Sequence, residues 1–301
     1  MKTTVPTYYK NFRCIADKCS HSCCVGWEID INPEAMEYYS SLEGDIGNML
    51  KANISKGDEP HFILKEGDRC PFLKDNGLCH LICELGENSL CNICADHPRF
   101  RNFFSGGVEM GLGLCCEAAC ELILKSPEPF AFEVEEDIYL EDEEKYFFNK
   151  RNKLLGIVEK NIPLSERFSL ILKEADATFP DSTLEEWVDF FLGLERLDEN
   201  WTKLLEGLKA DKFASVDLEE YELPLKNLVV YFLYRHLPSM LFDGDLCSKV
   251  KFAVLATAFI HTLAVNSEGV YIDLLCDYAR MFSAEIEYSD ENLEAVFNEM
   301  F

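Results

Sequence analysis

The chain is poor in basic residues. It has 28 lysines and arginines against 55 aspartates and glutamates in 301 residues, a formal net charge of −27. Affinity for nucleic acids depends on lysine and arginine contacts to phosphate, so this deficit argues against a nucleic-acid partner. An acidic chain is instead compatible with solubility in the cytoplasm, or with attraction to a basic, lysine-bearing protein.

Long apolar runs are also missing. The longest is the fourteen-residue stretch Phe252 to Val265, and it is interrupted by Thr257, His261 and Thr262. A bilayer-spanning helix needs about 20 predominantly apolar residues, so this stretch predicts a buried core helix and no transmembrane segment. The start of the sequence, MKTTVPTYYKNFRC, has neither the apolar core nor the cleavage motif of a secretory signal. We therefore expect a cytoplasmic location.

The motifs of several enzyme classes are incomplete or absent. Radical enzymes that cleave S-adenosylmethionine use a C-x3-C-x2-C triplet, whereas Cys19-x3-Cys23 is followed at once by Cys24. Gly111-x-Gly113 is a fragment of a dinucleotide fingerprint without the third glycine or a following βαβ unit, so no Rossmann sheet is expected. No Ser-His-Asp or Cys-His arrangement is visible.

Cysteine, in contrast, is abundant and unevenly placed. Twelve of the fourteen cysteines lie between Cys14 and Cys120. Cys247 and Cys276 fall in apolar helical surroundings and are predicted core thiols. Disulfides require an oxidising compartment, to which nothing in the sequence directs the chain, so metal binding is the expected use of the other twelve.

The spacing of these cysteines suits zinc or iron, whose sulfur ligands must converge within a few ångströms. It reads Cys14-x4-Cys19-x3-Cys23-Cys24, Cys70-x8-Cys79-x3-Cys83-x7-Cys91-x2-Cys94 and Cys115-Cys116-x3-Cys120. Neighbouring side chains diverge, so Cys23 and Cys24 should seldom bind one tetrahedral ion. They can serve two metals, or one cluster and one hydrogen-bond role. A purely structural zinc site is the alternative interpretation of these cysteines.

Composition changes after residue 125. Eight acids occur among the twelve residues from Glu133 to Glu144, which is typical of a solvated connector. We predict a mainly α protein with a mostly irregular cysteine-rich metal-binding domain at 1–125, an acidic connector at 126–144 and a helical bundle at 145–301. Because the first part lacks apolar periodicity, we expect metal to hold it together.

Local signals mark several helix starts. Asn32 as cap and Pro33 at the first position predict one helix in INPEAMEYYSSLEGDIGNML. Ser182 and Glu185 form a capping box, and Ser289 caps a last helix. One helical face in the second half is continuously apolar: Leu225, Leu228, Val229, Phe232, Leu233 and Leu237. Two histidines on apolar faces are expected core residues: His236 and His261.

Four cysteine stretches carry a resemblance: CIADKCSHSCCVGWEIDI, CPFLKDNGLCHL, ELGENSLCNICADHPRF and GLGLCCEAACELIL. It continues through LVVYFLYRHLP, VKFAVLA and ARMFSAEIEYSDENLEAVF, and so covers nearly the whole chain. In these stretches the chain resembles the flagellin lysine-N-methylase family and, more broadly, zinc- or iron-chelating cysteine-cluster proteins.

The resemblance implies methyl transfer from S-adenosylmethionine to lysines of flagellin or another protein or peptide. It also implies an iron–sulfur cluster, expected to be [4Fe–4S], with zinc as the alternative. The implied ligands are Cys14, Cys19, Cys23, Cys24, Cys70, Cys79, Cys94 and Cys115. Four positions depart from the family pattern. Cys116 replaces a proline and His97 a tyrosine, while Ala284 and Tyr288 stand where many members have arginine and histidine.

Further site residues are candidates beside these cysteines. Arg99 could hold a carboxylate of the methyl donor by bidentate pairing, or form a structural salt bridge. Glu28, Asp30 and Glu117 are candidate bases, with solvated surface acids as the alternative. Trp27 could stack on adenine or simply be a core residue. The competing functions are a non-catalytic zinc- or iron-chelating adaptor or cluster carrier, and an electron-transfer protein.

Overall fold

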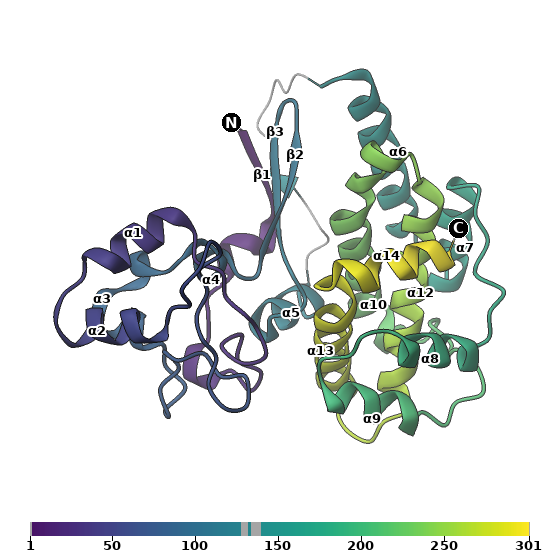
Figure 1. Ribbon diagram of the computed structural model, residues 1–301. Coiled ribbons are helices and arrows are strands. Elements are labelled where there is room, and N and C mark those ends of the chain that lie inside the picture. Colours follow the sequence, from purple (N-terminus) through teal and green to yellow (C-terminus); the bar gives the residue numbers. More distant parts are fainter. Residues whose placement is uncertain (1, 128–131, 134–139, 301) are drawn as a thin grey trace. The chain divides into compact units, whose positions relative to one another are not determined.

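The computed structural model describes residues 2–127, 132–133 and 140–300, and it divides into two compact units (Figure 1). The cysteine-rich unit comprises Arg13–Arg99 and Cys116–Ala118. The helical unit comprises Met1–Phe12, Phe100–Cys115 and Ala119–Phe301. The expected acidic connector lies largely outside the described residues.

This division differs from the linear one expected from composition. The first twelve residues and most of 100–125 belong with the helices rather than with the cysteines. The reason is strand pairing. β1 (Lys2–Pro6) pairs in parallel with β3 (Gly107–Leu112), with Lys2 opposite Gly107. Hydrogen bonds between segments so distant in sequence leave no trace in local composition.

The sheet of the helical unit is small. Its strand order is β2-β3-β1-β4, where β2 is Arg99–Phe104 and β4 is Phe132–Glu133, which pairs antiparallel with β1. The described strands form no Rossmann sheet, and the fold is mainly α, as predicted. A buried ion pair ties this sheet to the helices, because Arg151 donates to both carboxylate oxygens of Glu109 at 2.5 and 2.7 Å.

Helices make up the rest of this unit. α10 and α12 pack together at its centre (Figure 1). The apolar face predicted from Leu225 to Leu237 is fully buried. The helices are α5 (Glu117–Leu124), α6 (Asp142–Val158), α7 (Leu164–Glu174), α8 (Leu184–Gly193), α9 (Glu199–Gly207), α10 (Glu219–His236), α11 (Met240–Asp243), α12 (Leu246–Val265), α13 (Tyr271–Phe282) and α14 (Asp290–Glu299).

The predicted helix caps are borne out in part. Ser289 accepts a hydrogen bond from the Asn292 amide at the start of α14, as expected. The capping box of α8 is formed by Thr183 and Glu186, one residue later than predicted. α12 is long and apolar enough to cross a membrane, but 83% of its most apolar window is buried inside the structure, as in a core helix.

The cysteine-rich unit has short helices: α1 (Pro33–Ser41), α2 (Gly44–Asn53), α3 (His80–Leu85) and α4 (Asn92–Asp96). Asn32 is at the N-cap position of α1 and Pro33 occupies its first turn, as predicted, but the Asn32 side chain makes no capping hydrogen bond. The single helix expected from there is two helices, because Leu42 and Glu43 are extended. Gly44 follows at φ +75°, a conformation that favours glycine.

The cysteine-rich unit also has an apolar core, although its sequence lacks apolar periodicity. The rings of Tyr39, Phe62 and Phe72 are in contact in succession: Tyr39 is tilted against Phe62 with centroids 6.1 Å apart, and Phe62 meets Phe72 edge to face at 4.9 Å. The Tyr39 hydroxyl donates to the carbonyl of Ser89 at 2.7 Å. Apolar burial therefore contributes to the stability of this unit, in addition to whatever metal adds.

Candidate metal centre and functional site

Five thiols lie in or against the apolar core of the cysteine-rich unit: Cys24, Cys70, Cys79, Cys91 and Cys94. Backbone pairing brings them together from three segments. The amide of Cys70 donates to the carbonyl of Cys24 at 2.8 Å, and Cys79 forms an antiparallel bridge with Leu73. Cys91 is the cap residue of α4 and Cys94 lies in its first turn. We call these five residues the inner thiol set.

The inner thiols influence one another electrostatically. Hydrogen bonding from the Cys94 thiol lowers the pKa of Cys91 to about 7, and the same contact raises the pKa of Cys94 far above its usual range. Burial, together with Cys24 and Cys79, raises the pKa of Cys70 to about 11. Thiols that raise one another's pKa in this way ionise more readily beside a compensating cation, which a bound metal would supply.

A second group of thiols surrounds Cys23. The pKa of Cys23 is raised well above its usual range, first by its hydrogen bond with Cys24 and then by the charges of Cys24, Cys14 and Cys116. Burial raises the pKa of Cys19 to about 11, to which Glu117 and Cys116 add. We call Cys14, Cys19, Cys23 and Cys116 the outer thiol set.

The adjacent residues Cys23 and Cys24 therefore belong to different sets. Cys23 interacts with Cys14 and Cys116, whereas Cys24 affects Cys70, Cys79 and Cys94. The two residues lie in a turn in which the Val25 amide donates to the Ser22 carbonyl at 3.1 Å, and their side chains are hydrogen-bonded to each other. That the pair serves two metals, or one cluster and one hydrogen-bond role, stays a prediction.

The structure places the predicted ligand Cys115 in the other unit. It is buried in the helical unit, where its side chain is a hydrogen-bond partner of the Tyr288 hydroxyl. Its neighbour Cys116 belongs to the cysteine-rich unit instead. Two thiols of these sets, Cys91 and Cys116, are not among the ligands predicted from the sequence. The C-x2-C spacing of Cys91 and Cys94 was a signal that could have identified Cys91.

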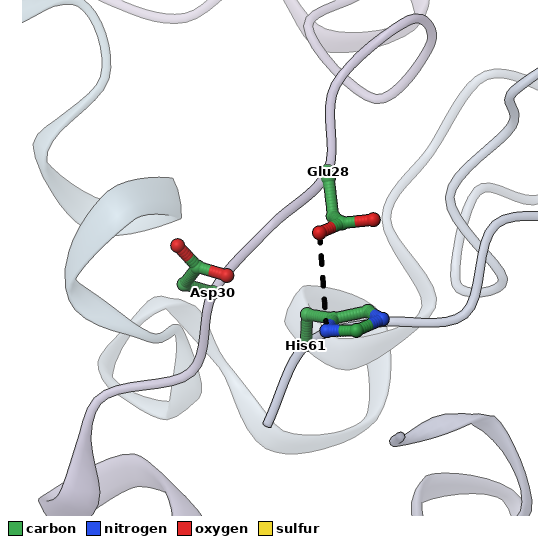
Figure 2. A group of neighbouring side chains, drawn as sticks. All are labelled: Glu28, Asp30 and His61. Atoms are coloured by element: carbon green, nitrogen blue, oxygen red, sulfur yellow. Dashed lines mark ion pairs between the residues drawn. The ribbon is translucent and has the colours of Figure 1, made fainter. Parts of the chain in front are cut away.

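Glu117, a candidate base, holds the loop that carries the outer set. Its Oε2 accepts hydrogen bonds from the amides of Ser20 at 2.8 Å and His21 at 3.3 Å, and from the Cys19 thiol at 3.6 Å. The carboxylate therefore positions Cys19. Glu28, another candidate base, lies on an exposed face with Asp30 and His61 (Figure 2).

Trp27, His97 and Arg99 are neighbours in the same unit. The rings of Trp27 and His97 meet edge to face with centroids 6.0 Å apart. Arg99 donates from Nη1 to the carbonyl of Ala95 at 3.3 Å. Burial, assisted by the charge of Arg99, lowers the pKa of His97 to about 4, so the imidazole is neutral at physiological pH. The structure thus places these three residues together, and any contact of Trp27 or Arg99 with a ligand stays a prediction.

The helical unit contains a buried charged network that sequence reasoning missed. Glu287 ends a π-helical turn, Ser283–Glu287, and its side chain is completely buried. It accepts from His236 Nε2 at 2.5 Å and from the Tyr231 hydroxyl at 3.0 Å, and Arg235 Nε lies 3.3 Å away. The expected core histidine His236 is thus a buried polar partner. π turns are frequent at functional sites.

The charges in this network stabilise one another. Burial acts to raise the pKa of Glu287, but Arg235 and the His236 hydrogen bond outweigh it and hold the pKa below its ordinary value. Burial lowers the pKa of His236. Arg235 also lies over the Tyr288 ring, with 4.6 Å between the guanidinium carbon and the ring centroid. The network is therefore an ionised pair with aromatic and hydroxyl partners.

Gly113 should not tolerate a side chain, because it adjoins this network. A Cβ atom there would lie 2.2 Å from the Tyr288 hydroxyl and 2.8 Å from Arg235 Nη1. We expect Gly113→Ala to lower the free energy of unfolding by about 1–3 kcal/mol, the usual cost of overpacking. Gly156→Ala is the control, since its Cβ would meet open space and should stabilise α6 by up to ~1 kcal/mol. Equal denaturant midpoints for both variants would refute this role of Gly113.

Comparison with known proteins decides the family. A family profile described as the FliB lysine N-methylase C-terminal domain matches residues 133–301, more than half of the chain. The chain belongs to the FliB lysine N-methylase family. The resemblance drawn from the cysteine stretches is confirmed at this level. No solved structure is significantly similar to this FliB-family chain.

Its curated relatives carry two kinds of name. It is 27% identical over 135 residues to the "Flagellar biosynthetic protein FliU" of Salmonella muenchen, covering 42% of this chain and 80% of that protein. It is 26% identical over 162 residues to proteins named "Lysine-N-methylase" from Salmonella choleraesuis and Salmonella typhimurium, covering 51% of this chain and 40% of each relative. The match thus spans less than half the length of those methylases.

Proposed function

We propose that the chain is an S-adenosylmethionine-dependent lysine N-methyltransferase whose thiols hold an iron–sulfur cluster. The observation that carries this proposal is the gathering of five thiols in and against one apolar core, in a member of a lysine N-methylase family. A single structural zinc ion uses four ligands, fewer than the nine thiols in the two sets.

The inner thiol set is the main candidate for the cluster ligands, and Cys14, Cys19, Cys23 and Cys116 are available for the remainder or for a second metal. If these thiols held a [4Fe–4S] cluster, its iron would supply a binding site for the amino and carboxylate groups of S-adenosylmethionine. The donor set fits such a group because five thiols from three segments gather at one apolar core, where Cys70 and Cys91 are buried and a cation would favour their ionised form.

Protein side chains would deprotonate the acceptor lysine and contact the methyl donor. The acceptor lysine must first lose a proton, for which Glu117 is the proposed acceptor because its carboxylate lies beside the outer thiol set. The neutral amine then attacks the sulfonium methyl carbon. The new C–N bond takes the amine lone pair, and the broken C–S bond leaves its electrons on S-adenosylhomocysteine. Arg99 and Trp27 are the proposed contacts for carboxylate and adenine.

The proposed acceptor is flagellin or another lysine-bearing protein or peptide in the cytoplasm. The net charge of −27 supports it, because an acidic protein attracts a basic partner. Names among the relatives refer both to lysine methylation and to flagellar biosynthesis.

The test is incubation of anaerobically prepared protein with methyl-labelled S-adenosylmethionine and flagellin from the same organism. We expect label on lysine, no 5′-deoxyadenosine, and a rate that rises with pH as more acceptor amine becomes neutral. Flagellin with its lysines acetylated is the control and should stay unlabelled. Absence of label from protein with a verified cluster would remove flagellin as the acceptor.

A second candidate function is a non-catalytic metal-binding adaptor or cluster carrier. The chain matches 80% of the length of FliU but only 40% of the length of the methylase. This difference favours the second candidate. Binding of S-adenosylmethionine to the cluster-loaded chain, measured by calorimetry, distinguishes the two. Metal binding without binding of the methyl donor would establish the adaptor.

A further inference from the structure

Three side chains with oxygen or nitrogen ligand atoms converge away from the thiol sets (Figure 2). Glu28, Asp30 and His61 each offer one such atom, and these atoms all lie within 4.8 Å of one another. Glu28 and Asp30 come from one extended segment and His61 from another. Among the described residues of the cysteine-rich unit, this is the one group of metal-ligating side chains that meets so closely.

Strand pairing fixes this arrangement. Asp30 and His61 are opposite one another in an antiparallel bridge. The Ile31 amide donates to the Pro60 carbonyl at 2.8 Å, and the Phe62 amide donates to the Ile29 carbonyl at 3.0 Å. Successive side chains of an extended segment point to opposite faces. Ile29, Ile31 and Phe62 are buried in the core. The residues that alternate with them, Glu28, Asp30 and His61, must therefore face outward together.

The imidazole is held in place by its own surroundings. His61 Nδ1 lies 3.1 Å from the Ser55 hydroxyl oxygen and 3.2 Å from the Glu59 carbonyl oxygen. The His61 amide donates to the same Ser55 oxygen at 2.9 Å. Nδ1 also lies 3.9 Å from Glu28 Oε1. Because Ser55 and Glu59 hold Nδ1, Nε2 is the ring nitrogen left for a metal, and support of the ring through its other nitrogen is a feature of metal-ligating histidines.

Charge provides an independent reason to expect a cation here. Two carboxylates, Glu28 and Asp30, face the same small space. In the described part of the chain neither has a lysine or arginine within 4.0 Å. Like charges on one face of a strand pair repel each other. A divalent cation would neutralise both carboxylates and bridge the two segments.

We propose that Glu28, Asp30 and His61 bind a divalent first-row metal ion, separate from the metal held by the thiols. Two carboxylates and one imidazole form an oxygen–nitrogen ligand set that leaves positions for water, and such a set suits Mn²⁺ or Fe²⁺. Thiolates select softer metals. One unit of this chain thus carries two kinds of metal site with different preferences. The site does not depend on the proposed methyl transfer.

Mn²⁺ is the probe, because it binds weakly to thiolates and gives an electron paramagnetic resonance signal in solution. Titration of cluster-loaded full-length protein should remove the signal of one free Mn²⁺ per chain. Bound Mn²⁺ should show nitrogen hyperfine coupling from His61. We expect Asp30→Asn and His61→Gln each to weaken binding by at least ~10-fold, and His61→Gln to abolish the nitrogen coupling.

A matched control exists in the same unit. His80 and Glu84 form a similar contact, with Nε2 and Oε1 4.0 Å apart and side-chain exposures of 30% and 56%, against 31% and 64% for His61 and Glu28. This pair is not part of a three-ligand group. His80→Gln should leave Mn²⁺ binding unchanged. Absence of Mn²⁺ binding to the wild-type protein, or equal binding by wild type, Asp30→Asn and His61→Gln, would overturn the proposal. Near-isosteric Asp30→Asn on an exposed face should leave the melting temperature of metal-free protein unchanged.

Discussion

Cys70→Ser will deplete the purified protein of iron and sulfide and abolish methyl transfer. Cys70 is only 7% exposed and lies within the apolar core of the cysteine-rich unit. A serine hydroxyl does not ionise at physiological pH and is a poor ligand for iron. It also brings a polar group into an apolar site, at a cost of about 1–3 kcal/mol if unpaired. Iron and acid-labile sulfide per chain, determined under anaerobic conditions, are the measurements.

Cys247→Ser is the control for this experiment. Cys247 lies in α12 of the helical unit, outside both thiol sets, and its replacement should leave metal content and methyl transfer unchanged. If Cys70→Ser retained full iron and sulfide, the inner thiol set would not contain the cluster. If it lost iron but still methylated lysine, metal would be structural and the proposed role of the cluster would be wrong.

Glu287→Ala will destabilise the helical unit by about 3–5 kcal/mol, the range observed when one partner of a buried ion pair is removed. The variant leaves the Arg235 guanidinium buried without its carboxylate and removes the acceptor of His236 and Tyr231. The measurement is the denaturant midpoint of helix loss by circular dichroism. Glu287→Gln should also be costly, because the amide keeps the shape of the side chain but not its charge.

Glu294→Ala serves as the comparison for this variant. Glu294 is an exposed residue of α14, only seven positions along the chain, and its removal should change the free energy of unfolding by no more than about 0.5 kcal/mol. A Glu287→Ala variant as stable as Glu294→Ala would mean that Arg235 is solvated or paired elsewhere.

Features that depend on local chemistry could be predicted from sequence. Asn32 and Pro33 mark the start of α1 because a proline in the first helical turn leaves no amide unsatisfied. The cap of α8 was misplaced by one residue because Ser182 and Thr183 both precede an acid by three positions, and only packing chooses between them. The break between α1 and α2 was missed because leucine and glutamate are good helix formers.

Features that depend on distant contacts could not be predicted. The sequence SAEIEYS gives no sign that Glu287 is buried, since two acids separated by one residue are typical of a solvated surface. The π-helical turn brings Glu287 onto Arg235 and His236, about fifty residues earlier in the chain. In the same way, spacing alone could not decide which of the adjacent residues Cys115 and Cys116 lies with the other thiols of the cysteine-rich unit.

The helical unit is built from three separate segments of the chain, and this affects how it folds during synthesis on the ribosome. β1 is translated about a hundred residues before its partner β3, and all of Arg13–Arg99 lies between them. The first strand must therefore wait, unpaired, while the cysteine-rich unit is completed and can acquire metal. An unpaired strand edge favours pairing with other chains, so slow folding of the cysteine-rich unit would lengthen the interval in which nascent chains can aggregate.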